Sequence, residues 1–430
     1  MRRILGAGLV LALSCRCVLA GAPRDNEYVR LPISEATDLF FSSVSFGQGS
    51  AHSRVSHIVE DDAGFLWFGT KDGLKRYDGY RFRDFRPDLR NRTSLSGVLV
   101  NELFKDRSGK LWVAADENLD RYDPSTEEFT HYAPIPGRFE GPVNDINQDR
   151  DGVIWLATSH GLSRLDATTE TISRFQHDPD DPSSLTSDFL RSTFEENDGT
   201  FWVATNQGLD VFDRRTGKVT QHFSLSNPLL GTKTFSNETV RLFKDHSGVL
   251  WVAAARDGLA IVDRQSNKLR FFPLDPANDA RLQPGAYAIH EDRHGTLWVG
   301  TNSGGLLTLD ANRSRFVRYR NNPNDLDSLS SDQVLTFFED HEAGIWLGTN
   351  GGGVLRVSEQ AQRFKRYRHH PGVPNSLSTD YVSSVFEDSR GLLWVGSKGA
   401  VTRIDRTTGQ FSRHPLRAGE GSQSDVTSIA

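Results

Sequence analysis

Short stretches of alternating apolar and polar residues run along most of this chain, separated by turn-forming residues. In Glu291 to Thr301, EDRHGTLWVGT, an acidic turn that ends in glycine separates two apolar or β-branched stretches. An Asp that begins such a turn can accept a hydrogen bond from the backbone two residues later, and Gly tolerates the positive φ of a hairpin exit. Because Leu297 to Thr301 alternates between two faces, the pattern predicts a β-hairpin whose second strand carries a buried Trp.

The hairpin pattern recurs along the chain, and each copy contains one of the eight tryptophans. They are Trp67, Trp112, Trp155, Trp202, Trp251, Trp298, Trp346 and Trp394. A regular spacing of roughly 45 residues indicates a repeat architecture. A buried Trp removes on the order of 150–250 Å² from water, so we expect each one to pack between neighbouring repeats.

One full repeat contains four predicted strands. They are Val334 to Glu339 (innermost), Ile345 to Thr349, Val354 to Val357 and Phe364 to Arg368 (outermost). Four short antiparallel strands in a unit of this length are typical of a β-propeller blade. Most third strands end on an Asp that is expected to start the next turn, and the outer-to-inner loops repeat the text Ser-Leu-(Ser/Thr), which predicts function or wedging between blades.

The first 20 residues predict a secretory signal peptide, with basic Arg2 and Arg3 followed by an apolar run. A lipoprotein attached through Cys15 is the weaker alternative. We expect cleavage after Ala20, a polar lead-in over 21–38 and a periplasmic or secreted product. The rest of the chain contains no apolar stretch long enough for a transmembrane helix.

Charge and cysteine content exclude several classes of protein. The whole chain has a formal net charge of −6, and loss of Arg2, Arg3 and Arg16 with the leader makes it more acidic. Nucleic-acid binding is therefore not expected, because it needs a basic face. Both cysteines, Cys15 and Cys17, lie in the leader, so disulfides and thiol chemistry are not expected either.

The ends of the repeat array suggest how a ring closes. Leu39 to Phe46 predicts an isolated strand that resembles the outer strand of a repeat. We therefore expect an all-β fold with a seven-bladed propeller over 39–358, closed by this strand, and a second propeller that begins at 359–430. A single eight-bladed ring is the alternative. Ser424 to Ala430 matches the start of another inner strand, so we expect the chain to be a truncated product or a fragment of a longer gene.

The text of the repeat resembles the two-component regulator propeller repeats. The pattern E-D-x-x-G-x-L-W-x-G-T-x-x-G-L-x-R-Y-D is followed by an F-x-x-Y strand and a Ser-Leu-Ser loop, and Phe65 to Gly79 is the best match. The resemblance covers roughly Leu39 to Ala430. Glu196, in place of the turn Asp, and Ala343, in place of the turn Gly, depart from the pattern and make those two turns uncertain.

The resemblance implies a bacterial extracytoplasmic sensor. In this family, two seven-bladed propellers typically precede a β-sandwich, a transmembrane helix and a histidine kinase or diguanylate cyclase. The expected partners are a small-molecule or glycan ligand, a second propeller and a homodimer partner. Such a module performs no chemistry itself. The alternative is a stand-alone secreted propeller that acts as a binding protein or as an enzyme, for example a quinoprotein-like dehydrogenase, although Trp does not follow the Asp-x-x-Thr-Gly turns at the spacing which that class needs.

Specificity is expected where the repeats differ within the turn between the second and third strands. These positions are Lys71, His160, Asn206, Arg256, Asn302, Asn350 and Lys398. We expect the face that carries them to receive a ligand or to dock a partner propeller, and an ordinary turn role is the alternative for any single residue. No catalytic residue, metal site or cofactor is predicted, and the eight tryptophans are expected to be structural.

Overall fold

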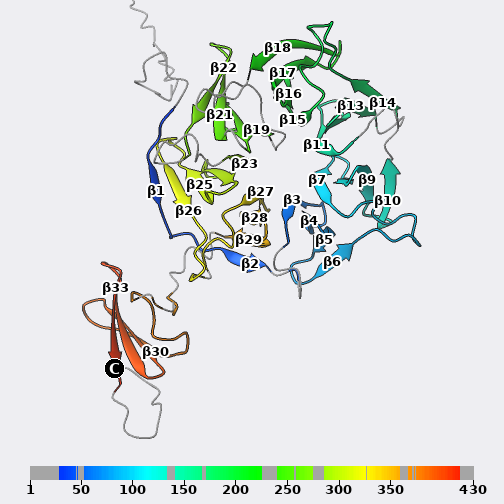
Figure 1. Ribbon diagram of the computed structural model, residues 1–430. Coiled ribbons are helices and arrows are strands. Elements are labelled where there is room, and N and C mark those ends of the chain that lie inside the picture. The colour runs from blue at the N-terminus through cyan, green and yellow to red at the C-terminus, as the bar shows by residue number, and fades with distance from the viewer. Residues whose placement is uncertain are drawn as a thin grey trace, which may run out of the picture.

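The computed structural model describes residues 29–44, 46, 53–132, 141–166, 171–224, 240–255, 258–274, 285–325, 327–358, 367–369, 372 and 374–416. The predicted signal peptide and the final residues 417–430 lie outside this part of the chain. Within the described residues, every regular element is a β-strand, and the strands form eight sheets, numbered here in chain order (Figure 1). The all-β prediction is confirmed.

The first four sheets each contain four consecutive antiparallel strands. The first sheet contains β3 (Val55–Glu60), β4 (Leu66–Thr70), β5 (Gly73–Tyr77) and β6 (Phe82–Phe85). The second contains β7 (Val100–Lys105), β8 (Leu111–Ala115), β9 (Asn118–Asp123) and β10 (Glu128–Tyr132). The third contains β11 (Val143–Gln148), β12 (Ile154–Thr158), β13 (Gly161–Asp166) and β14 (Thr171–Phe175). The fourth contains β15 (Leu190–Glu195), β16 (Phe201–Thr205), β17 (Gly208–Asp213) and β18 (Lys218–Ser224).

Two of the remaining sheets also include a strand from the N-terminal segment. The fifth contains β19 (Val240–Lys244), β20 (Leu250–Ala254), β21 (Gly258–Asp263) and β22 (Lys268–Phe272). The sixth contains β23 (Ala286–Glu291), β24 (Leu297–Thr301), β25 (Leu306–Leu309), β26 (Phe316–Tyr319) and β1 (Ile33–Glu35). The seventh contains β27 (Val334–Glu339), β28 (Ile345–Thr349), β29 (Val354–Val357) and β2 (Ser42–Val44). The eighth contains β30 (Val382–Glu387), β31 (Leu393–Ser397), β32 (Ala400–Asp405) and β33 (Gln410–Pro415).

The N-terminal segment completes sheets formed much later in the chain. Strand β2 pairs antiparallel with β29, which confirms a strand within Leu39 to Phe46 and its place outside the third strand of the seventh repeat. The predicted outer strand of that repeat, Phe364 to Arg368, lies largely outside the described residues. Within the expected polar lead-in over 21–38, β1 pairs in parallel with β26.

Successive inner strands lie side by side. Each of β3, β7, β11, β15, β19 and β23 contacts the inner strand of the next sheet, and β27 in turn contacts β3 (Figure 1). The predicted packing of Trp between repeats is confirmed here. Trp67 joins the apolar cluster of the second sheet, for example, and Trp346 of the seventh sheet packs with Val55, Leu66 and Phe68 of the first.

A single acidic side chain organises each hairpin between the first and second strands. In the third sheet, Asp149 Oδ1 accepts the amides of Asp151 (3.0 Å) and Val153 (2.9 Å), while Oδ2 accepts the indole N–H of Trp155 at 2.8 Å. All eight tryptophans donate to the turn acid six residues earlier in the same way. The predicted turn role of Asp is thus confirmed, and the indole contact explains why the acid and Trp keep a fixed spacing.

The two turns that depart from the repeat pattern keep the hairpin. The longer Glu196 side chain still accepts the indole N–H of Trp202 at 2.7 Å, and Asp198 accepts the amide of Thr200. In the seventh sheet, Ala343 adopts the positive φ of 68° that Gly adopts elsewhere. A Cβ on Gly344 would lie 2.5 Å from the Arg356 guanidinium, so the glycine at this position makes room for that arginine.

The outer-to-inner loops with the Ser-Leu-(Ser/Thr) motif pack between sheets. Of the two roles predicted for them, function and wedging, this is the second. Their leucines Leu95, Leu185 and Leu329 are each 1% exposed and belong to three different apolar clusters. The residue after the leucine also bonds a buried acid: Ser96 donates its amide and its hydroxyl to Asp120, both at 2.8 Å. In the described loops, this repeated sequence motif therefore places a leucine in the apolar core between sheets.

A second set of contacts, called here the inter-sheet latches, joins neighbouring sheets at the turns between their first and second strands. Each latch links a residue at or just after the turn acid of one sheet to the residue just before the turn acid of the next. The seven latches among described residues are Asp62–Lys105, Arg107–Gln148, Arg150–Glu195, Glu196–Lys244, His246–Glu291, Arg293–Glu339 and His341–Glu60. The charges are reversed in Asp62–Lys105 and Glu196–Lys244. The last latch joins the seventh sheet to the first.

The eighth sheet differs from the others in its burial. On β30, Val382, Val385 and Phe386 are 42%, 59% and 37% exposed, whereas Val334, which begins β27, is 0% exposed. Figure 1 draws β30 and β33 apart from the other sheets. No described sheet covers the apolar side chains of β30.

The bond between acid and indole predicts a large stability difference between two acids in the same turn. Asp149→Ala removes the acceptor of a buried N–H, so we expect the free energy of unfolding to fall by about 2–4 kcal/mol. Asp151, whose side chain is 72% exposed, is the matched control. Urea denaturation of Asp151→Ala should give a change within about 0.5 kcal/mol. Equal losses in the two variants would contradict the role given to Asp149.

Candidate functional site

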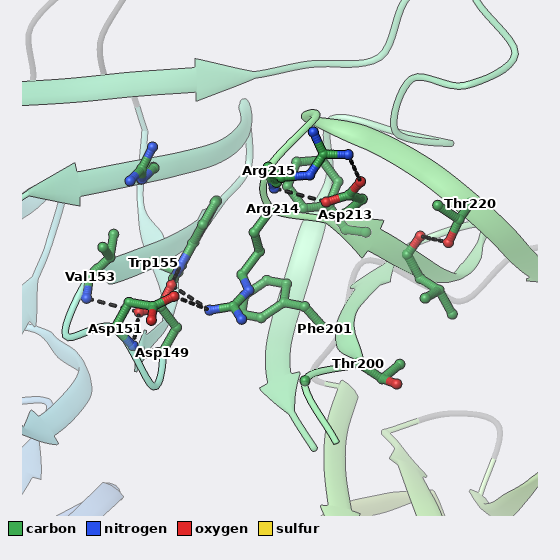
Figure 2. Close-up of a pocket in the computed structure, with 14 residues that line it drawn as sticks. Asp149, Asp151, Val153, Trp155, Thr200, Phe201, Asp213, Arg214, Arg215 and Thr220 are labelled. Atoms are coloured by element: carbon green, nitrogen blue, oxygen red, sulfur yellow. Dashed lines mark hydrogen bonds and ion pairs between the residues drawn. The ribbon is translucent and has the colours of Figure 1, made fainter. Parts of the chain in front are cut away.

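Two cavities in the described part of the chain differ strongly in the polar side chains that line them. One, called here the outer groove, has a volume of about 620 Å³ and is lined by residues of the third and fourth sheets, including Thr220 of the outer strand β18 (Figure 2). There Arg214 extends toward Asp149, with 2.6 Å between Nη1 and Oδ2, and its Nη2 lies 2.8 Å from Glu195. Since its central charges are already paired with each other and support the Trp155 turn, this groove has the chemistry of a structural joint between sheets.

The second cavity, called here the mouth cavity, has a volume of about 480 Å³ and lies where the inner strands begin. Inner strands of seven successive sheets contribute to its wall. The lining side chains are Arg54, Ser56, His57, Leu99, Asn101, Asp116, Glu117, Pro142, Asn144, Arg191, Arg241, Tyr287 and Leu335. A cavity of this size is large enough for a small molecule, and its many polar side chains favour a polar one.

A register shift in the inner strands brings side chains to this wall. In the first, second, third, fourth, sixth and seventh sheets, the second residue of the inner strand lies at a shift in the ladder to the second strand. Such β-bulges redirect a side chain. The residues at the shift are Ser56, Asn101, Asn144, Arg191, Tyr287 and Leu335, and all of them line the mouth cavity.

Strand β19 is the exception, and its difference creates a charged network. Its ladder to β20 is continuous, so Arg241 pairs with Ala253. The same ladder position in the first three sheets holds His57, Glu102 and Asp145, which pair with Gly69, Ala114 and Ala157. The missing bulge thus moves Arg241 from the bulge position to the level of these three side chains.

Arg241 connects four sheets through this network. Its Nη2 donates to Glu102 at 2.8 Å and lies 2.7 Å from His57 Nε2, and its Nη1 donates to Asp145 at 3.0 Å. His57 Nε2 also lies 2.9 Å from Glu102. Asp145 further accepts the amide of Thr193 at 2.8 Å. The network forms a polar floor beneath the mouth cavity.

The two acids of the network have opposite pKa shifts. Burial alone would raise the pKa of Glu102, but the adjacent Arg241 and His57 outweigh it and hold this pKa below its usual value. Burial, reinforced by the charge of Glu102, raises the pKa of Asp145 to about 7 despite its contact with Arg241. One arginine therefore holds one acid fully ionised, and the second acid titrates near neutrality.

Two polar atoms at this level have no hydrogen-bond partner among the described residues. One is the hydroxyl of Ser192, a residue that is 2% exposed, and the other is Nδ1 of His57. Ser192 pairs with Ala204, the ladder position that corresponds to those of His57 and Asp145. Buried polar atoms normally have a partner, so both atoms are free to bond a guest molecule or water.

Of the seven predicted site residues, four lie at the rim of the mouth cavity, two lie elsewhere and one is outside the described residues. The backbone amides of Lys71, Asn206, Asn302 and Asn350 bond the carbonyl of the residue before an inner strand, so these four lie together at the rim of the mouth cavity. None of the described candidates is among the side chains that line it. Asn302 instead braces the rim, since its side chain accepts the amide of Gly285 and donates to the carbonyl of Ala255, both at 3.0 Å.

The other predicted positions are not brought to the rim in this way. His160 lies one residue further along its turn, and its carbonyl accepts Nε of Arg174 from the outer strand β14. Lys398 belongs to the turn between β31 and β32 of the eighth sheet. Arg256 lies outside the described residues.

Two kinds of lining residue were missed by the sequence analysis. Asp116 has the turn position that Lys71 has in the first repeat, and its carboxylate accepts the amide of Val98 at 2.8 Å. The bulge residues were also missed, although a signal existed: the residue after the first apolar position of the inner strand changes from Ser56 to Asn101, Arg191 and Tyr287 between repeats.

Two side-chain groups superficially resemble a catalytic triad. Ser96, Asp120 and His131 meet, with His131 Nδ1 2.7 Å from Asp120, and Thr186, Asp210 and His222 repeat the arrangement in the fourth sheet. In both groups the hydroxyl donates to the carboxylate instead of to the imidazole, so the imidazole does not activate the hydroxyl. Among the described residues, no cluster of three His, Cys, Asp or Glu side chains is arranged to hold a metal ion.

The raised pKa of Asp145 predicts how stability depends on pH. Between its unfolded value near 4 and its folded value of about 7, the folded protein holds a proton that the unfolded chain has lost. The free energy of unfolding should therefore fall as pH rises through this window, by up to about 1.4 kcal/mol per pH unit from this group. Asp145→Asn should remove this component of the slope when urea denaturation is measured from pH 5 to 8.

Asp181 provides a matched control for the Asp145 prediction. Its hydrogen bond with Lys218 lowers the pKa of Asp181 to about 2, so Asp181→Asn should not change the slope between pH 5 and 8. A wild-type slope that persists in Asp145→Asn would contradict the assignment.

Comparisons with known proteins identify the repeats. The sequence profile described as "Two component regulator propeller" matches residues 49–72, 137–160, 283–303 and 376–399. "Histidine kinase P4" of Formosa agariphila is 35% identical over 63 residues, which is 15% of this chain and 5% of that protein. No helix in the described residues is long and apolar enough to cross a bilayer.

Solved structures extend the match to the fold. The extracellular domain of the hybrid two component system BT3049 from B. thetaiotaomicron superposes with a TM-score of 0.69 at 25% identity, over 87% of this chain and 49% of that one. Virginiamycin B lyase from Staphylococcus aureus, at 16% identity and a TM-score of 0.54 over 74% of this chain and 99% of that one, shares the fold alone. This chain spans about half of the solved extracellular domain and a small part of the kinase. In its repeats the chain is similar to the two-component regulator propeller family, and in its fold it is similar to the extracellular domain of a hybrid two-component system.

Proposed function

We propose that this chain is the periplasmic ligand-sensing region of a two-component receptor and that it binds a small molecule in the mouth cavity. The observation that carries the proposal is the cavity itself, whose wall takes side chains from the inner strands of seven successive sheets. A ligand held there can contact several of these sheets at once. The resemblance to the extracellular domain of a hybrid two-component system supports the sensing role.

We also propose that the first seven sheets form a seven-bladed propeller over 39–358 and that the eighth, within 359–430, begins a second one. Three contacts support seven blades over eight: β2 pairs with β29, Trp346 packs on the first sheet, and His341 latches to Glu60. The exposed Val382, Val385 and Phe386 of β30 support a further blade packed against the eighth sheet.

The role proposed for the full receptor is signal input without chemistry in this chain. Ligand binding would alter the geometry of a receptor dimer, and a histidine kinase is the favoured output because the matched relative carries that name. The rim residues Lys71, Asn206, Asn302 and Asn350 remain proposed contacts for a ligand or for a partner propeller. Their backbone bonds to the residues before the inner strands support a role in holding the rim.

The mouth cavity can be tested by filling it. Leu335 lines the cavity, and a larger side chain there occupies ligand volume. A panel of small metabolites should contain compounds that raise the melting temperature of the wild-type chain, and these shifts should vanish in Leu335→Trp. Thr220→Trp, which alters the outer groove instead, is the matched control and should keep the shifts. Shifts that survive Leu335→Trp would contradict a ligand site in the mouth cavity.

A further inference from the structure

Three neighbouring parts of the mouth-cavity wall differ in their chemistry. Following the order of the inner strands, Leu335 of the seventh sheet is followed by Arg54 before β3 and then by Asn101 and Glu117 of the second sheet. Tyr287, from the sixth sheet, lies next to Leu335 in this order. Three neighbouring arcs of the wall thus carry, in order, Tyr287 with Leu335, a cation, and hydrogen-bond acceptors with a carboxylate. The wall also contains apolar Leu99 and Pro142 and the cations Arg191 and Arg241.

The third arc favours a hydrogen-bond donor with a positive charge. Asn101 donates its amide group to the carbonyl of Asp116 at 3.2 Å, which leaves its Oδ1 as an acceptor. Glu117 forms no hydrogen bond or ion pair with any other described residue. The Asp116 carboxylate, held by the amide of Val98, adds a second negative charge beside Glu117.

The second arc favours a carboxylate. The side chain of Arg54 has no ion-pair or hydrogen-bond partner in the described part of the chain, although its backbone carbonyl accepts the amide of Lys71. A guanidinium binds a carboxylate through two parallel hydrogen bonds. Arg191 adds a further cation to the wall.

A ligand with a single charge fits this wall poorly. Arg54 and Glu117 are both exposed and unpaired among the described residues. An anion can pair only with Arg54, a cation only with Glu117, and a neutral sugar with neither charge. A zwitterion with an apolar substituent satisfies all three arcs.

We propose that the mouth cavity binds a free α-amino acid with an apolar side chain. Its ammonium group faces Glu117 and Asn101, its carboxylate faces Arg54, and its side chain packs against Leu335 and Tyr287. This inference rests on the proposed function, because it concerns the same cavity. It adds the chemical class of the signal.

The test combines truncated ligands with truncated side chains in isothermal titration calorimetry. L-Phenylalanine, phenethylamine and 3-phenylpropionate share one ring, but the second lacks the carboxylate and the third lacks the ammonium group. Each truncated ligand should bind the wild-type chain at least about tenfold more weakly than L-phenylalanine, as expected for the loss of one charge-assisted contact.

Matched variants assign each charged group. In Arg54→Ala, L-phenylalanine should bind no more tightly than phenethylamine, because the carboxylate has lost its partner. In Glu117→Gln, L-phenylalanine should bind no more tightly than 3-phenylpropionate. A shape defect would weaken all three ligands alike, so these pairwise equalities separate recognition of charge from damage to the fold.

Three outcomes would overturn the inference: no binding of L-phenylalanine, equal binding of the three compounds to the wild type, or an unchanged preference in both variants. The proposed function fails separately. If another compound binds the wild type and is lost in Leu335→Trp, the mouth cavity remains a ligand site and only the amino-acid assignment is wrong. If bound compounds survive Leu335→Trp, both are wrong.

Discussion

The fold depends on satisfying one buried donor in each repeat, the indole N–H of tryptophan. A large aromatic side chain stabilises the contact between neighbouring sheets, but its N–H would be costly if it were buried without an acceptor. The turn acid six residues earlier supplies that acceptor, and its second oxygen holds the hairpin in shape. Sheet packing and turn geometry are therefore fixed by the same carboxylate. That coupling explains how Glu196 can replace Asp: its longer side chain still reaches Trp202 at 2.7 Å.

Much of the fold could be predicted because this local rule repeats. The strands Val334–Glu339, Ile345–Thr349 and Val354–Val357 agree with their predicted bounds, since alternation and glycine turns define them without reference to the rest of the molecule. Strand β1 could not be predicted in this way. It is three residues long, and it exists because the edge of β26 offers unpaired backbone groups to Ile33–Glu35. A pairing between residues almost three hundred positions apart leaves no periodic mark in a short polar segment.

The candidate site was less predictable, for a physical reason. Turn residues such as Asn302 vary between repeats, but their side chains are engaged in supporting the rim. Six of the side chains that line the mouth cavity come from bulged positions, and one missing bulge decides the chemistry of the cavity floor. Strand β19 keeps a continuous ladder, so Arg241 reaches Glu102 and Asp145 across the ring. Repeat comparison finds the right face of the molecule, and the backbone register decides which residues point into it.

The reversed charges of the inter-sheet latches bear on how a repeat array of this kind can evolve. Repeats arise by duplication, and identical copies could be exchanged or inserted freely. Here the latch charges depend on the order of the sheets. A copy of the first sheet inserted before the fourth would bring Asp62 against Glu195. A copy of the third sheet inserted before the second would bring Arg150 against Lys105. Recombination between these repeats would set like charges against each other. The charges at these contacts thus distinguish one repeat from another. They disfavour further duplication or exchange of repeats, the process by which such arrays arise.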